Sequence, residues 1–176
     1  GFDPLTYDAY GTGADAPDAA LALKAEKTSQ KIMTVVNSFA AAGEAAGATA
    51  AESMAASFAA LANVVKTTAT GLAAGTVGVS AISFNLADIQ AIKTAAATEM
   101  ASAKDASGNV INAAAVTNFT AAVVQAEAAI VNVATAIQAV TDITDTADAF
   151  QVIAALETQV AAAAVAVVKV ANGEAL

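Results

Sequence analysis

Carboxylates are the side chains of this sequence that could most readily do chemistry, because three groups of polar residues could supply oxygen ligands to a calcium ion. The first group lies around the N-terminal segment and consists of Asp3, Asp8, Asp15 and Asp18. The second consists of Asp105, Ser107 and Asn109. The third consists of Asp142, Asp145 and Asp148. Calcium takes about six to eight oxygens, several of them from carboxylates, and none of the three groups reproduces the full pattern of a calcium-binding loop.

The second group lacks the Glu that closes a calcium-binding loop. Its alternating spacing is that of the start of a calcium loop, but Val116 stands where the closing Glu would be. Asp and Asn also favour turns and helix caps, because their side chains bond to nearby backbone groups. We therefore expect turn and cap roles for most of these residues. The N-terminal group remains the candidate metal site, with calcium as its ion.

The sequence contains few of the residue types that commonly serve in catalysis. The 176 residues contain no His, Cys, Trp or Arg, so the usual near-neutral proton shuttle and the thiolate nucleophile are missing. Ser29 and Lys31 are two positions apart, which places them on different faces of a helix. A carboxylate hydrolase would need two acids facing each other across a cleft, whereas the Glu residues fall among helical positions. We expect no enzyme, and no catalytic or cofactor-binding residues.

Charge and hydropathy restrict the partners. The formal net charge is −9 and the isoelectric point is about 4.1, so the chain should repel nucleic acid and anionic lipid. The mean hydropathy of +0.62 comes largely from Ala and Val. The most apolar stretch, residues 160–168, ends at Lys169 and is shorter than the roughly 20 residues that cross a bilayer. We therefore expect neither nucleic-acid binding nor a membrane span.

Helical periodicity dominates after residue 16. Pro17 suits the first turn of a helix, and Gly43 and Gly47 mark the end of that helix. Thr49 and Glu52 form the pattern of a capping box at the start of a second helix that runs to about residue 71. Further helices are expected at about 86–104, 113–140 and 144–171, with a linker that could hold a short strand at 71–84 and a turn at 105–109.

These elements predict an all-α fold, a bundle of four or five Ala/Val-rich helices with an extended N-terminal arm. The arm covers residues 1–16 and the bundle residues 17–176. Two helical hairpins, 17–71 and 113–172, would be joined by 72–112. Because the chain begins with Gly1 rather than Met, we expect a processed product or a module of a longer protein.

The fourth and fifth helices are apolar on more than one face. In the fourth, these residues are Val123, Val124, Ile130, Val131, Val133 and Ile137. A helix that is apolar on most sides must be covered on most sides. Either one of these helices is central in the bundle, or its remaining apolar face contacts another subunit.

The N-terminal segment carries a family resemblance. The sequence FDPLTYDAY, followed by the first helix up to about residue 48, resembles helical modules of very large secreted bacterial proteins that also carry cadherin-like, calcium-binding or other repetitive surface domains. The resemblance is strongest at residues 2–6 and covers about the first third of the chain. It implies an extracellular or cell-surface location, a structural or adhesive role, and calcium as a ligand. The sequence has no glycine-aspartate nonapeptide repeat, a departure from such proteins.

We therefore expect a non-catalytic structural module that associates with copies of itself or with neighbouring modules, as in a matrix, filament or adhesin. The arm would supply interface anchors, namely Phe2, Leu5, Tyr7 and Tyr10. The alternative is a monomeric helical module that binds calcium or another ligand.

Overall fold

The computed structural model describes residues 19–73 and 83–139, together with residues 155 and 158. These residues form helices α1 (Ala19–Ala45), α2 (Ala50–Ala73), α3 (Leu86–Met100) and α4 (Ala113–Ala139). The predicted all-α bundle is confirmed, with four helices in the described part of the chain. The arm and the fifth helix lie outside the described residues.

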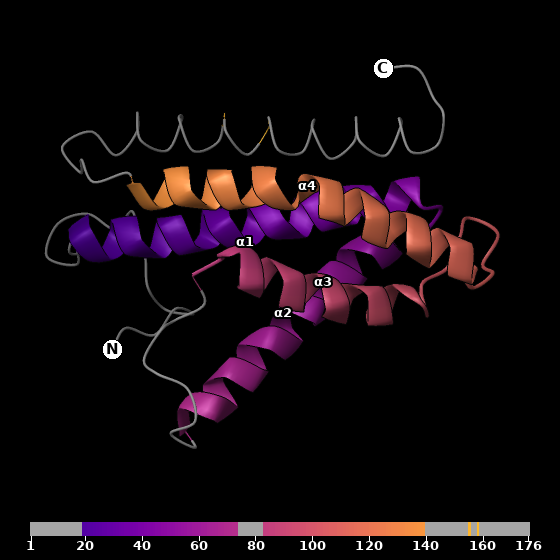
Figure 1. The fold of residues 1–176 in the computed structure, drawn as a ribbon, viewed down its shortest axis with the longest axis horizontal. Helices are drawn as coiled ribbons and strands as arrows, with labels where there is room; N and C mark the ends of the chain where they lie inside the picture. The colour runs from indigo at the N-terminus through magenta and orange to yellow at the C-terminus, as the bar shows by residue number, and fades with distance from the viewer. Residues whose placement is uncertain (1–18, 74–82, 140–154, 156–157, 159–176) are drawn as a thin grey trace, which may run out of the picture.

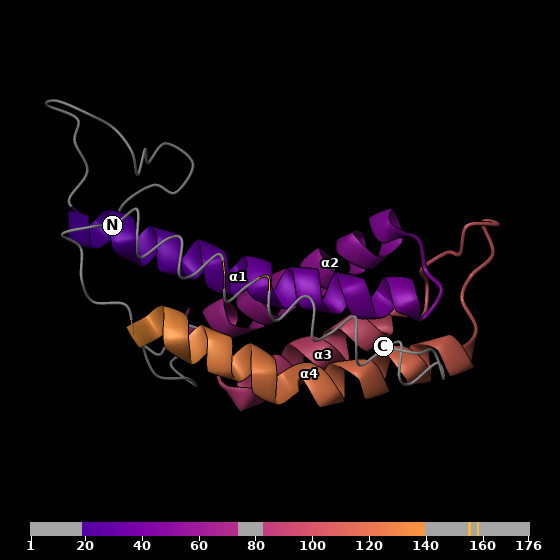
Figure 2. The ribbon, with the colours of Figure 1, turned by 90° about the horizontal axis from the view of Figure 1, so that it is seen from above.

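The four helices are arranged so that each packs mainly on two neighbours, with a smaller contact between α1 and α3. Helix α1 packs on α2 and α4, and α3 packs on the same two helices from the other side. Helices α1 and α4 lie side by side along the long axis of the molecule, as both views show (Figures 1 and 2). Helix α2 runs obliquely to this pair, on the side of the molecule away from α4 (Figure 1). One long face of α2 is therefore left outside the bundle.

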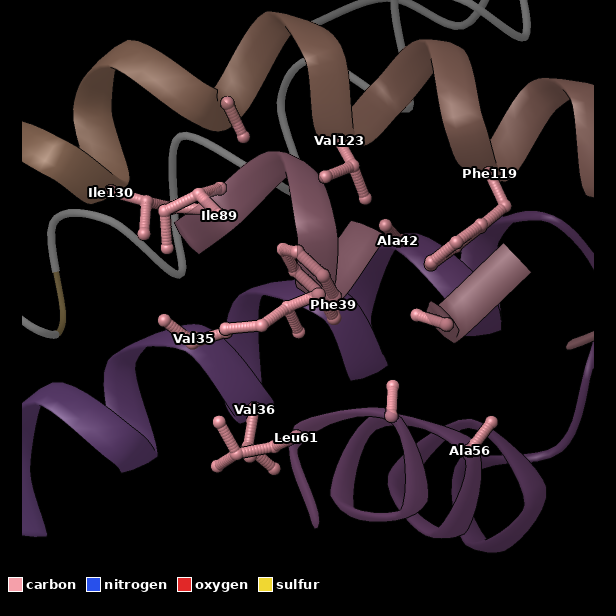
Figure 3. Packing of buried hydrophobic residues seen from close by; sticks show 14 of the residues in the cluster. Val35, Val36, Phe39, Ala42, Ala56, Leu61, Ile89, Phe119, Val123 and Ile130 are labelled. Carbon is pink, nitrogen blue, oxygen red and sulfur yellow. The ribbon is translucent and has the colours of Figure 1, made fainter. Parts of the chain in front are cut away.

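The core combines a few large side chains with many alanines. Phe39 of α1 meets Phe119 of α4 edge to face, with ring centroids 6.2 Å apart and an interplanar angle of 82° (Figure 3). Ile89 of α3 and Ile130 of α4 are fully buried in the same cluster. Ala42 and Ala60 are buried in this cluster, where a methyl group leaves room for the neighbouring backbone.

The end of α1 differs from the prediction. Gly43 lies inside the helix, which continues to Ala45, whereas Gly47 has the positive φ of 104° that a helix terminus favours. The amide of Ala48 donates to the Gly43 carbonyl and that of Gly47 to the Glu44 carbonyl. These two bonds form a Schellman motif, so the prediction was right for Gly47 and wrong for Gly43.

Gly43 is required for packing rather than for termination. A Cβ atom at this position would lie 2.7 Å from Ser53 Oγ and 2.9 Å from Ser53 Cβ. Ser53 is on α2 and is fully buried. Gly43 therefore sets how closely α1 and α2 approach each other.

The predicted capping box at Thr49 is only half formed. Thr49 Oγ1 accepts from the Glu52 amide at 3.2 Å, as predicted. The Thr49 amide, however, donates to the Lys104 carbonyl at 2.9 Å. This bond ties the α1–α2 turn to the α3–α4 connection and takes the donor that Glu52 was expected to satisfy.

Candidate functional site

Most of the predicted site residues lie outside the described part of the chain. This holds for the candidate calcium ligands Asp3, Asp8, Asp15 and Asp18 and for the interface anchors Phe2, Leu5, Tyr7 and Tyr10. It also holds for the acidic group at 142–148. These residues remain predictions from the sequence.

Asp105 lies in the described chain, and its carboxylate orders a turn. Its Oδ1 accepts from the amides of Ser107, at 2.8 Å, and Asn109, at 2.9 Å. Gly108 supplies the positive φ of 81°, and Lys104 pairs with Val110 in an antiparallel bridge that closes the loop. The turn expected at 105–109 is confirmed. Among the described residues there is no group of three or more acidic side chains placed to hold a metal ion.

Three other acidic side chains of the described bundle take part in structural contacts. Asp88 completes a reciprocal capping box with Asn85 at the start of α3. Glu99 of α3 accepts from Asn63 of α2 at 3.1 Å. Glu127 of α4 pairs with Lys93 of α3. Each carboxylate therefore has a structural role that needs no ligand.

The serine and lysine considered for a dyad are separated as predicted. Ser29 is exposed, whereas Lys31 is buried between α1 and α4. Ser57 Oγ donates to the Ser53 carbonyl at 2.8 Å, which is the usual local bond of a helical serine. None of these hydroxyls is placed beside a base.

Two lysines of α1 form a polar cluster at the end of α4 that was not expected from the sequence. Lys31 Nζ donates to Gln138 Oε1 at 2.9 Å, and Lys27 Nζ donates to the Gln138 carbonyl at 3.0 Å. Positive charge is favourable there, because the last carbonyls of a helix carry partial negative charge. The ring of Phe84, a residue with a positive φ of 58°, lies 5.8 Å from Lys31 Nζ. Lys31 therefore belongs to the contact between α1 and α4.

Burial should make Lys31 a source of pH dependence. Desolvation, with a smaller contribution from Lys27, lowers the pKa of Lys31 below its usual value of 10.5. The unfolded chain keeps the usual pKa, so between the lowered value and 10.5 the unfolded state binds more protons than the folded state. The free energy of unfolding contributed by Lys31 therefore rises with pH through this window.

Urea denaturation at neutral pH and at a series of alkaline pH values should show this pH dependence of the free energy of unfolding. Relative to Lys31→Met, the wild type is expected to gain stability as the pH approaches 10.5. If the free energy of unfolding changes with pH in the same way in the wild type and in Lys31→Met, the burial of a charged Lys31 is contradicted.

Helix α4 has the composition of a membrane helix but takes part in the core. Among the described helices, it is the one long and apolar enough to span a membrane by length and composition. Its apolar side chains Val123, Ile130 and Ile137 are buried against the other helices. Of the six apolar residues predicted to form more than one face, only Val124 is exposed. The packing of α4 on α1 and α3 thus accounts for most of these apolar residues.

Among the described residues, two of the five large apolar side chains that are exposed lie on the outer face of α2. Phe58 and Val65 are 44% and 46% exposed. Three exposed alanines continue the same face, and we call the five residues the α2 stripe: Ala51, Ala55, Phe58, Ala62 and Val65. The α2 stripe was not predicted from the sequence, although its five residues follow one another at intervals of four, three, four and three.

A shallow hollow on the outer face of α4 offers no comparable feature. The described residues that line it all belong to that helix, namely Val116, Thr117, Thr120, Ala121, Val124 and Gln125. None of these is charged, so the hollow has no group that would fix a polar ligand. The α2 stripe is therefore the strongest candidate for a functional surface in the described chain. Comparison of this chain with protein-family models, with curated proteins and with solved structures found no match.

Proposed function

We propose that this chain is a non-catalytic structural module that associates with copies of itself, as a component of a bacterial matrix, filament or adhesin outside the cell or on its surface. The α2 stripe is the observation that carries the proposal. A solvent-facing helix face normally bears charged or polar side chains, whereas these five residues are all apolar. An apolar face of this kind is typical of a protein contact.

The remaining features of the chain support a structural role. The described carboxylates with assigned contacts cap helices, order a turn or join helices, so the bundle accounts for them. The net charge of −9 opposes nonspecific aggregation. The location outside the cell rests on the resemblance of the N-terminal segment to modules of secreted bacterial proteins.

Self-association is tested by the light-scattering mass of the purified chain over a concentration series, first with calcium and then with a chelator. We expect the mass to rise above that of the 17.1 kDa monomer as the concentration increases. Loss of this rise in chelator would place a metal ion at the contacts. A constant monomer mass in both conditions would contradict the proposal, and a calcium-induced rise in melting temperature would then favour the monomeric calcium-binding alternative.

A deletion tests whether the N-terminal arm takes part. If Phe2, Leu5, Tyr7 and Tyr10 reach an adjacent copy, removing residues 1–14 should lower the mass reached at high concentration. The circular dichroism of the bundle should be unchanged, because the four described helices begin at Ala19. Unchanged assembly after the deletion would exclude the arm and leave helical faces as the contact.

A further inference from the structure

The α2 stripe has the spacing of a coiled-coil seam. Its five residues follow one another at intervals of four, three, four and three, which is the repeat of the a and d positions of a heptad. The opposite face of α2 carries Ser53 and Ala60, both fully buried in the bundle. The α2 stripe therefore lies on the side of α2 that faces away from the bundle. The exposed residues of α3, in contrast, mix the polar Gln90, Thr94 and Thr98 with Leu86, Ala87 and Ala91.

We infer that the α2 stripe pairs with the same stripe of a second copy, antiparallel, about a two-fold axis near Ala60. This inference rests on the proposed self-association and adds the surface, the partner and the orientation. An antiparallel seam pairs each a position with a d position of the other helix. Phe58 of one copy then faces Ala62 of the other, and Val65 faces Ala55.

Side-chain size favours this orientation. Each large residue of the stripe meets a small one across the axis, so the two helices can approach closely while Phe58 and Val65 fill the space. A parallel pair would place Phe58 against Phe58 and Ala55 against Ala55. In that arrangement, layers with two large side chains would alternate with layers that hold only two alanines.

Charge favours the same orientation. Glu52 and Lys66 flank the stripe on one side, at equivalent heptad positions two repeats apart. About an axis near Ala60, Glu52 of each copy lies opposite Lys66 of the other, and the symmetry makes the contact twice. In a parallel pair these two residues would not meet. Complementary charges beside a seam are a common determinant of helix orientation.

The length of the stripe sets the strength of the contact. From Ala51 to Val65 the helix rises by about 21 Å, so the interface falls at the small end of specific contacts. A dissociation constant on the order of micromolar is expected for such an interface. Because the contact is isologous, it closes as a dimer, and longer assemblies would need a second contact, such as the arm.

Cysteine cross-linking tests the orientation, and the absence of native Cys makes single-cysteine variants unambiguous. In the inferred dimer, position 55 faces position 65 of the other copy, whereas each position lies about 15 Å along the axis from its own counterpart. Under mild oxidation, a mixture of Ala55→Cys and Val65→Cys should form a covalent dimer. Either variant alone should form little.

The outcomes separate this inference from the proposed function. Cross-linking of each variant alone as readily as the mixture would show a parallel pair. No cross-linking of the mixture, at a concentration where the wild-type mass exceeds that of a monomer, would exclude the α2 stripe while leaving self-association intact. A wild-type mass that stays monomeric at every concentration would reject both.

Charge reversal tests the register independently. Glu52→Lys would place two lysines opposite each other at both ends of the seam, and we expect the dissociation constant to rise about fivefold. Adding Lys66→Glu to the same chain should restore the wild-type value, because the pair is re-formed with its signs exchanged. Glu44→Lys, at an exposed position on α1, is the matched control. No restoration in the double variant would overturn the antiparallel register.

Discussion

Lys93→Met is expected to lower the free energy of unfolding by about 3 kcal/mol. Lys93 of α3 and Glu127 of α4 form an ion pair whose side chains are only 17% and 10% exposed. Removing the ammonium group would leave the Glu127 carboxylate among buried apolar neighbours without its partner. Urea denaturation of the two proteins at neutral pH measures the difference.

A double variant isolates the cause of this loss. Glu127→Leu added to Lys93→Met removes the orphaned charge, and much of the lost stability should return, because an apolar pair of similar volume can replace a buried ion pair at little cost. A loss of less than about 1 kcal/mol in the single variant would indicate a solvated pair of the kind found on surfaces. The contact between α3 and α4 would then rest on apolar packing alone.

Gly43→Val is expected to cost about 3 kcal/mol of stability. Even the first added carbon would lie 2.9 Å from Ser53 Cβ, an atom that side-chain rotation cannot move, so α1 and α2 must separate. Gly43→Ala should be destabilising to a smaller extent. Chemical denaturation of both variants, with Glu44→Ala at the exposed neighbouring position as the control, provides the measurement.

The sign of the Gly43→Ala result is the decisive part of that series. In a helix with free space, replacing Gly by Ala stabilises by about 1 kcal/mol, because Ala is the better helix former. Close contact with Ser53 predicts the opposite sign. A stabilised Gly43→Ala protein would therefore contradict the close approach of α1 and α2.

Much of the fold could be predicted from periodicity and cap residues. The fourth helix was expected at 113–140 and extends over Ala113–Ala139, because Asn112 and the recurring Val and Ile residues define it locally. The third was expected to continue to residue 104 but ends at Met100. Its last residues are drawn into contacts that are distant in sequence, since the Lys104 carbonyl accepts the Thr49 amide.

The partners of small and long side chains could not be predicted in this way. From the sequence alone, Gly43 was predicted to end the helix, whereas in the structure it lies close to Ser53 of α2. Lys31 has the appearance of a surface lysine until Gln138 approaches from α4. In both cases the decisive neighbour lies in a different helix, so sequence periodicity within one helix carries no information about it.

The apolar outer face of α2 was not predicted from the sequence, for a related reason. Most of the large Val and Ile residues of α4 are buried by packing against α1 and α3. Helix α2 is rich in Ala, and an alanine is common on both buried and exposed faces. Its outer face therefore became evident only once Phe58 and Val65 were found exposed.

Sedimentation analysis of the full chain beside Ala62→Glu tests most directly whether the α2 stripe joins two copies. Ala62 is exposed in the bundle, so the variant should fold normally, and in the dimer its carboxylate would lie against Phe58 of the other copy. We expect a concentration-dependent dimer for the wild type and for the control Thr94→Glu on α3, and a monomer for Ala62→Glu. Equal masses for the wild type and Ala62→Glu at every concentration would contradict the account.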